Sequence, residues 1–144
     1  MGADDAKRVA LLSIRPEFAR AIFAGMKTVE FRRAPLAADI KVALVYATMP
    51  VGQVIGWFTI ARVSASTPGG LWRRFARQGA IERRAYFDYF DGASRAFGIE
   101  IATAVGLDQT LALEELVPGL RAPQSFQYLA AADVAPVLAV AAAR

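Results

Sequence analysis

The spacing of apolar and polar residues predicts a mixed set of strands and helices. Compact apolar runs predict buried strands at 8–14, 40–47, 54–63 and 96–104. Helices are predicted at 16–25, 71–78, 81–90 and 130–143. The segment 111–117 has no clear period, and 123–129 is expected to be irregular. Because the helices are not inserted regularly between the strands, the order favours an α+β fold, and the strands could curl into a small barrel.

One segment alternates strictly. In Thr28–Arg33 the side chains of Val29 and Phe31 point to one side. The opposite side is polar and carries Thr28, Glu30 and Arg32. This segment is therefore expected to be a half-buried strand with a polar face. Pro16 is tolerated in the first turn of the preceding helix, and Gly25 is expected to end it.

Size and composition are those of a folded domain. The chain has 144 residues, of which 56% are hydrophobic and 21% charged, so a disordered tail is excluded. No repeat or low-complexity linker divides it, and we expect a single domain over 1–144. The longest apolar tract, 130–143, is too short for a bilayer and is interrupted by Asp133 and Pro136. We therefore expect a cytoplasmic protein.

The sequence contains no histidine and no cysteine. Serine–histidine–aspartate and cysteine–histidine catalysis are excluded, as are metal sites ligated by these residues. We expect neither a metal nor a cofactor. Acid–base chemistry would have to use carboxylates, lysine, tyrosine, water or a group of the substrate.

A motif of the form GxKxxExR lies at Gly25–Arg32. Its flanks, in order, are Leu12-Ser-Ile-Arg-Pro-Glu-Phe18, Tyr46-Ala-Thr-Met-Pro50, Val54-Ile-Gly-Trp-Phe58 and Pro123-Gln-Ser-Phe126. Together these segments resemble the ASCH domain, a branch of the PUA-like superfamily. The resemblance covers about residues 9–129 and leaves the predicted helix 130–143 outside it.

The resemblance implies a small mixed β-barrel flanked by helices, with a cleft beside the GxKxxExR segment. It also implies RNA binding, which is generally proposed for ASCH proteins. Some proteins of similar fold hydrolyse acetylated cytidine, and others are described as ribonucleases. In the acetylcytidine amidohydrolases a threonine stands where this chain has Glu30, which argues against that activity here.

The motif's charged residues form a cation–anion–cation row. Glu30 and Arg32 are two residues apart on one strand face, about 7 Å, and Lys27 can reach the same face. Such cations suit phosphate, while the carboxylate accepts hydrogen bonds from a base or a ribose hydroxyl. If the protein is an enzyme, Lys27 would act as a base, with Glu30 orienting it or activating water. The alternative is an exposed row of salt bridges that closes the barrel.

A second basic feature lies within Leu71–Arg84. Five arginines oppose Glu82 there, a balance of +4 that equals the net charge of the whole chain. We expect a phosphate track along this segment, carried by Arg73, Arg74 and Arg77. The alternative is a solvated helix face whose Trp72 and Phe75 pack inward.

The remaining candidates are aromatic or polar. One of Trp57 and Phe58 is expected to face the cleft, and Trp57 is included among the binding residues. The aromatic rings that could stack on a base are those of Tyr86, Phe87, Tyr89 and Phe90. Ser13 and Arg15 are expected to bind a phosphate at the start of the first helix. Gln124 and Ser125, in the last irregular segment, are expected to contact the edge of a base.

The favoured function is a module that binds RNA or a nucleotide and recognises an unpaired or modified base in the cleft. The alternatives are a hydrolase that acts on RNA or on a modified nucleoside, and a protein-interaction module. Clustered arginines favour a nucleic acid over a free nucleoside, because a nucleoside carries no phosphate.

Overall fold

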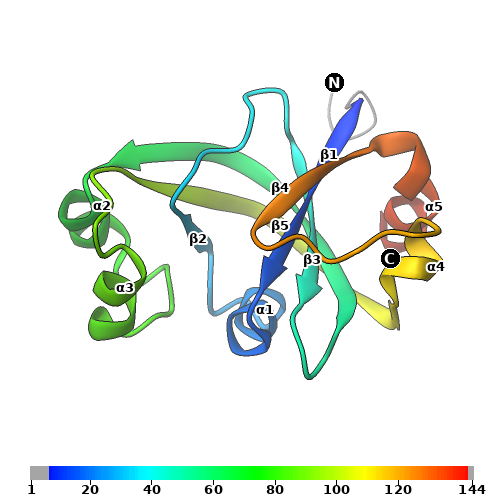
Figure 1. Cartoon of the computed structure of the whole chain (residues 1–144), viewed down its shortest axis with the longest axis horizontal. Helices are drawn as coiled ribbons and strands as arrows, with labels where there is room; N and C mark the ends of the chain where they lie inside the picture. Colours follow the sequence, from blue (N-terminus) through cyan, green and yellow to red (C-terminus); the bar gives the residue numbers. More distant parts are fainter. Residues whose placement is uncertain (1–6, 143–144) are drawn as a thin grey trace.

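A computed structural model describes residues 7–142, which form a six-stranded sheet and five helices (Figure 1). In chain order the elements are β1 (Arg8–Ile14), α1 (Pro16–Phe23), β2 (Val29–Arg32), β3 (Val42–Ala47), β4 (Gln53–Ser66), α2 (Pro68–Phe75), α3 (Arg83–Tyr89), β5 (Ala96–Leu111), α4 (Leu113–Leu116), β6 (Phe126–Ala130) and α5 (Ala131–Ala142). The predicted α+β class is confirmed.

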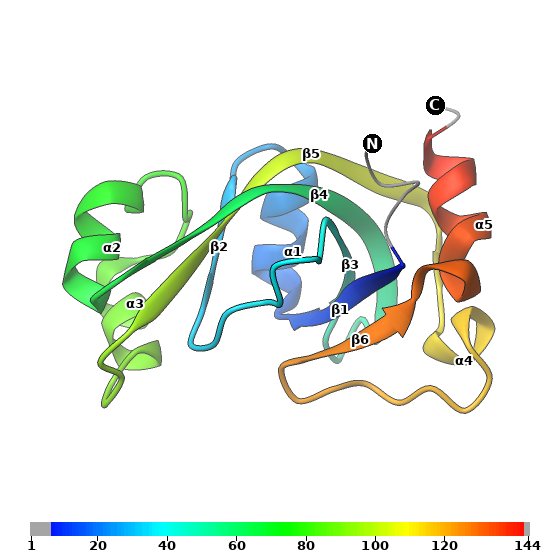
Figure 2. The same cartoon turned by 90° about the horizontal axis from the view of Figure 1, so that it is seen from above.

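The strand order is β2-β5-β4-β3-β1-β6. β1 and β3 are parallel, and the other pairs are antiparallel. The long strands β4 and β5 arch across the molecule, with α2 and α3 at one end and α4 and α5 at the other (Figure 2). The sheet is strongly curled, but it is not a closed barrel as the sequence suggested, because β2 and β6 remain its two edges.

Local sequence explains the helix boundaries. Gly25 has a φ of +79°, a left-handed conformation that follows the end of α1 as predicted. α2 begins at Pro68, earlier than predicted, because Thr67 is its N-cap. The Thr67 side chain accepts a hydrogen bond from the Gly70 amide at 3.0 Å. The Pro-Gly-Gly sequence, although typical of a turn, is therefore the first turn of this helix.

The last third of the chain differs most from expectation. β6 was predicted as irregular chain, yet it pairs with β1 along the sheet edge. β5 continues to Leu111, beyond the predicted strand. The C-terminal helix, α5, spans Ala131–Ala142 with Pro136 inside it. Ala143, the last residue predicted for this helix, lies outside the described residues.

Apolar side chains pack on both faces of the sheet. Phe58 belongs to a core beneath α1, whereas Trp57 belongs to a second core that includes Leu44 and Val134. A third cluster lies beneath α2 and α3 and includes Phe31 and several aromatic rings. Between residues 7 and 142, no helix combines the length and apolar character needed to span a bilayer.

Candidate functional site

A cavity of about 930 Å³ opens beside β2, where the α1 start, the α3 segment and the loop before β6 converge. This size is typical of small-ligand pockets. Many of the predicted binding residues line it, namely Ser13, Arg15, Lys27, Glu30, Arg32, Gln124 and Ser125. They come from three separate parts of the chain, which the curl of the sheet brings together.

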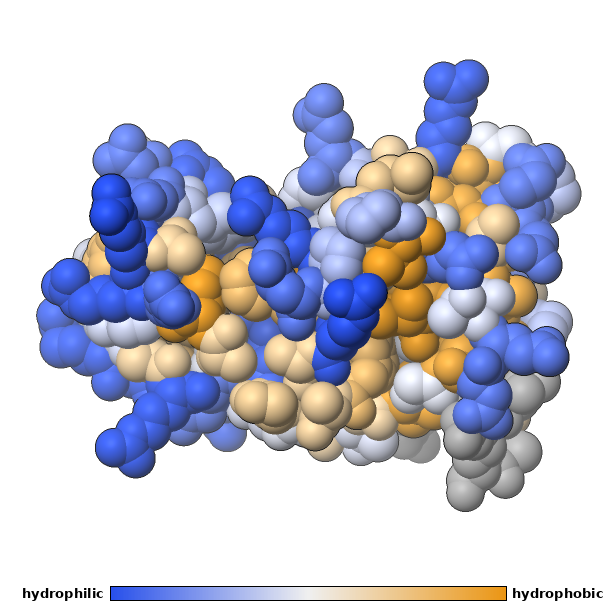
Figure 3. Space-filling view, turned by 90° about the horizontal axis from the view of Figure 1, so that it is seen from below, coloured by the Kyte–Doolittle hydropathy of each residue, from blue (hydrophilic) through white to orange (hydrophobic). Residues whose placement is uncertain are grey.

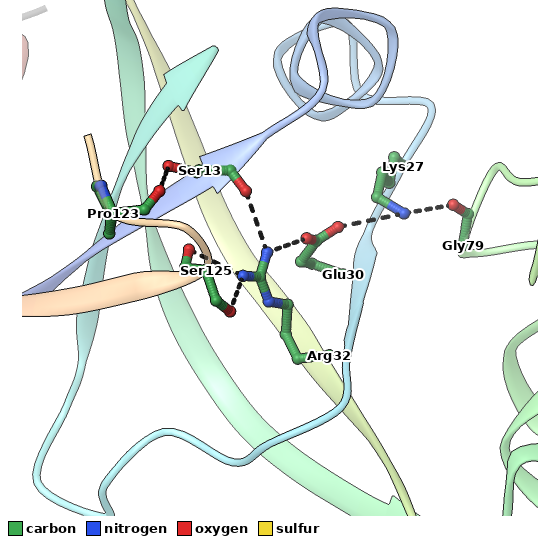
Figure 4. Close-up of polar contacts among 7 residues, drawn as sticks. All are labelled: Ser13, Lys27, Glu30, Arg32, Gly79, Pro123 and Ser125. Carbon is green, nitrogen blue, oxygen red and sulfur yellow. Dashed lines mark hydrogen bonds and ion pairs between the residues drawn. The ribbon is translucent and has the colours of Figure 1, made fainter. Parts of the chain in front are cut away.

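The charged row of the motif lies in the wall of this cavity, and it is buried. Lys27, Glu30 and Arg32 are 3%, 6% and 6% exposed. Lys27 Nζ is 3.5 Å from Glu30 Oε1, and Arg32 Nη1 donates to Glu30 Oε2 at 3.0 Å (Figure 4). The alternative of an exposed row is therefore wrong, because the side chains that converge on β2 cover it.

Burial changes the energetic meaning of the row. Desolvation of buried charges opposes their mutual attraction, so a buried ion pair is weak evidence for a gain in stability. Because this row of three buried charges also lines a cavity, it is the candidate binding or reaction site.

Lys27 lies in the turn between α1 and β2. Its ammonium group donates to the Gly79 carbonyl at 2.6 Å and lies 5.2 Å and 5.3 Å from the ring centroids of Phe18 and Phe31. Burial lowers the pKa of Lys27 below its usual value, and the neighbouring Glu30 opposes this shift. In the folded protein Lys27 therefore releases its proton more readily than a lysine in water.

Arg32 bridges the seam of the curled sheet, which is the gap between edge strand β2 and the side that carries β1 and β6. Its Nη2 donates to the carbonyl and the hydroxyl of Ser125 at 2.9 Å and 2.7 Å, and its Nη1 donates to the Ser13 carbonyl at 3.4 Å. The guanidinium group thus ties edge strand β2 to β1 and to the residue before β6 (Figure 4). Its Nε is buried and finds no acceptor among residues 7–142.

The polar residues around Arg32 differ in their roles. The Ser13 hydroxyl donates to the Pro123 carbonyl at 2.6 Å, which fixes the loop before β6. Arg15 is the N-cap residue of α1 and is exposed at the cavity. Gln124 is also exposed there. The arrangement therefore places a fixed floor of charges beneath a more accessible polar rim.

The connection between α2 and α3 forms another wall and is docked on β2. The amides of Thr28 and Val29 donate to the Gln78 carbonyl at 2.9 Å and 3.1 Å. Gly79 lies against the Phe31 ring so closely that a Cβ there would be 2.0 Å from a ring carbon. Only glycine allows this approach.

We expect Gly79→Ala to lower the free energy of unfolding by about 1 to 3 kcal/mol, because the added methyl group must displace the Phe31 ring. Urea denaturation measures the change. Gly69→Ala in α2 is the matched control, since its nearest neighbour would be an Arg73 nitrogen at 3.6 Å. Equal stabilities of the two variants would contradict the tight docking of this connection.

Two groups of predicted residues lie away from the cavity. Arg73, Arg74 and Arg77 are exposed but do not line it. Figure 3 shows hydrophilic residues gathered over the end of the molecule that carries α2 and α3. The prediction that Trp57 binds a ligand in the cleft is wrong, because its side chain packs in the second core and does not line the cavity. Trp72 does pack inward, with its ring 4.9 Å from that of Tyr86.

Several residues that line the cavity were not predicted from the sequence. Thr48, Asp88 and Arg33 are among them, and their proximity depends on how α3 and the loop after β3 fold back towards β2. Of the four aromatic residues predicted as candidates for base stacking, Tyr89 lines the cavity and the other three do not. Over the described part of the chain, no cluster of three or more potential metal-ligating side chains occurs.

Comparison with known proteins agrees with this geometry. The family model for the ASCH domain matches residues 12–105. The "ASCH domain-containing ribonuclease" of Zymomonas mobilis is 36% identical over 129 residues, which cover 85% of each chain. The crystal structure of ASCH from Zymomonas mobilis superposes with a TM-score of 0.82 at 31% identity, covering 94% of this chain and 96% of that one.

A more distant neighbour shares the fold alone. The N-terminal domain of McrB from Staphylothermus marinus superposes with a TM-score of 0.58 at 10% identity, covering 92% of both chains. The family match extends over the motif and over most of the curled sheet that positions it. The chain therefore belongs to the ASCH domain family and has its PUA-like fold.

Proposed function

We propose that this protein binds single-stranded RNA and takes one nucleotide into the cavity beside β2. The observation that carries the proposal is the buried row of Lys27, Glu30 and Arg32 in the wall of a cavity of about 930 Å³. Stability alone does not account for three buried charges, whereas recognition of a polar, anionic ligand does.

The row offers complementary groups to a nucleotide. The Glu30 carboxylate accepts hydrogen bonds from base amino groups or ribose hydroxyls, and its position is fixed by cations on either side. Arg32 lines the cavity, and its guanidinium group would attract an anionic oxygen of the ligand. Exposed Arg15 at the start of α1 is suited to an adjacent phosphate.

The arginines of α2 and the residues after it extend this site. Arg73, Arg74 and Arg77 are exposed on the hydrophilic end of the molecule and would hold phosphates of the strand outside the cavity. Contacts of this kind position a nucleic acid without reading its sequence. Recognition would then depend on the cavity and affinity on the arginines.

RNA cleavage is the second candidate function. Its support is the lowered pKa of Lys27 together with the name of the Zymomonas mobilis relative, which is called a ribonuclease. An uncharged Lys27 would take the proton from a ribose 2′-hydroxyl, whose oxygen attacks the adjacent phosphorus. The 5′-oxygen then leaves with a proton from water, giving a 2′,3′-cyclic phosphate, and Arg32 would stabilise the developing negative charge.

The test is a titration with short single-stranded RNA at two salt concentrations, followed by analysis of the RNA for cleavage. We expect saturable binding that weakens as salt rises. Intact RNA after incubation would leave binding as the function, whereas a 2′,3′-cyclic phosphate product would establish cleavage. Absence of binding at low salt would contradict the proposal and favour a free modified nucleoside or a protein partner.

The arginines outside the cavity make a separate prediction. Arg73→Ala is expected to weaken binding to all RNA sequences alike and to reduce the slope of log K against log salt by about one. The same salt titration measures it. Arg121→Ala, which removes an exposed arginine from the loop before β6, is the control. An unchanged slope for Arg73→Ala would remove this arginine from the phosphate track.

A further inference from the structure

The aromatic residues of the α3 region are not equivalent. Tyr86 and Phe90 are 0% and 2% exposed, and the Tyr86 hydroxyl donates to the Pro68 carbonyl. Phe87 is half-buried, with its ring centroid 5.9 Å from that of Trp72. Tyr89 is 40% exposed and lines the cavity. Three of these four rings therefore serve the core, and Tyr89 remains available to a ligand.

Tyr89 lines the same cavity as the charged row, and the charges of that row act on its hydroxyl group. Burial is the main cause that raises the pKa of Tyr89. The charge of Arg32 lowers this pKa, and the charge of Glu30 raises it. The residue is nevertheless 40% exposed, so part of it remains open to solvent beside the cavity. An incoming base would thus meet the ring beside the charges that recognise polar groups.

The structure also holds this ring in place. Arg33 Nη1 donates to the carbonyls of Tyr89 and Asp91 at 2.7 Å and 3.2 Å, which anchors the end of α3 to the residue after β2. The Tyr89 and Phe90 rings pack at 4.8 Å with an interplanar angle of 74°. A ring that is already held loses little conformational freedom when a ligand packs on it.

We propose that the Tyr89 ring is the stacking platform for the base that enters the cavity, an inference that rests on the proposed RNA binding. Stacking on an aromatic ring is tolerant of sequence, so Tyr89 supplies affinity for any unpaired base. The bases of a duplex are already stacked and paired, so this platform selects single-stranded segments. The choice among bases is left to the Glu30 row.

The test uses two RNA probes and three variants. One probe carries a single 2-aminopurine base flanked by abasic residues, and the other is abasic throughout. Fluorescence of 2-aminopurine falls when the base stacks. Tyr89→Leu keeps apolar bulk without the ring, Tyr89→Phe keeps the ring without the hydroxyl, and Phe87→Leu alters a ring of the same helix outside the cavity.

We expect the wild type to quench the probe and to bind it more tightly than the abasic strand. Tyr89→Leu should abolish quenching and bind the base-containing probe about 5- to 100-fold more weakly, with little change for the abasic strand. Tyr89→Phe and Phe87→Leu should behave as wild type. Circular dichroism of each variant verifies that it is folded.

Two results would overturn the inference while leaving RNA binding intact. The first is wild-type affinity and quenching in Tyr89→Leu. The second is a loss in Tyr89→Phe as large as that in Tyr89→Leu, which would assign the effect to the hydroxyl instead of the ring. If the wild type binds no RNA of natural sequence at low salt, the proposed function fails and the inference fails with it.

Discussion

Arg32→Ala is expected to lower the free energy of unfolding by about 3 kcal/mol. Loss of one partner from a buried ion pair typically costs about 3 to 5 kcal/mol, and the cavity admits water, which favours the lower end. The variant leaves Glu30 with Lys27 alone, at 3.5 Å. It also removes the donors that hold Ser125 and Ser13 to β2.

Urea denaturation of Arg32→Ala beside Arg62→Ala gives the cleanest comparison. Arg62 also pairs with a glutamate, at 2.9 Å, but its side chain is 67% exposed. Its loss should change stability by under about 1 kcal/mol. If the two variants lose the same stability, Arg32 does not hold the seam of the sheet together. Arg32→Lys, which keeps the charge but not the fork of donors, should fall between wild type and Arg32→Ala.

Lys27→Met is expected to weaken RNA binding at least about tenfold, because it removes a charged donor from the cavity while its apolar stem keeps packing on Phe18 and Phe31. If the protein cleaves RNA, cleavage should be lost. Lys41→Met, at an exposed lysine, is the control and should retain wild-type behaviour.

The same variant should change how stability depends on pH. The folded-state pKa of Lys27 lies below the unfolded value of about 10.5, so between the two the unfolded chain binds more protons. The contribution of Lys27 to the free energy of unfolding therefore rises with pH through this window. The pKa values of Tyr86 and Tyr89 are raised by burial and act alike in both variants. Over several alkaline pH values, the free energy of unfolding of Lys41→Met should therefore increase relative to that of Lys27→Met. Parallel pH profiles for both would contradict the burial of Lys27 as a charged group.

Elements with a strong local signal were predictable from the sequence. The apolar run of β1 and the glycine after α1 each identify their element without help from the rest of the chain. β6 was missed because its strand character comes from pairing with β1, more than a hundred residues away in sequence. Closure of the barrel was overestimated, since the number and order of the strands do not determine whether the two edges of a sheet meet.

The site was predictable in its residues more than in its environment. The GxKxxExR spacing is enough to place Glu30 and Arg32 on one side of a strand, with Lys27 in the turn before it. Their burial depends on Ser125 and on Gly79, which approach β2 only in the folded chain. Alternation along β4 could not say which face met the cleft, and in the structure neither Trp57 nor Phe58 does.

Under the proposed function, the bridge made by Arg32 would link ligand occupancy to the integrity of the fold. One guanidinium group lines the cavity and also joins β2 to β1 and to the residue before β6. A ligand held in the cavity binds the folded chain and not the unfolded one, so by mass action it raises the melting temperature. The stabilisation grows with the logarithm of the ligand concentration divided by the dissociation constant. The domain can thus serve as its own reporter in a thermal-shift screen of nucleotides, without a label or an assay of activity.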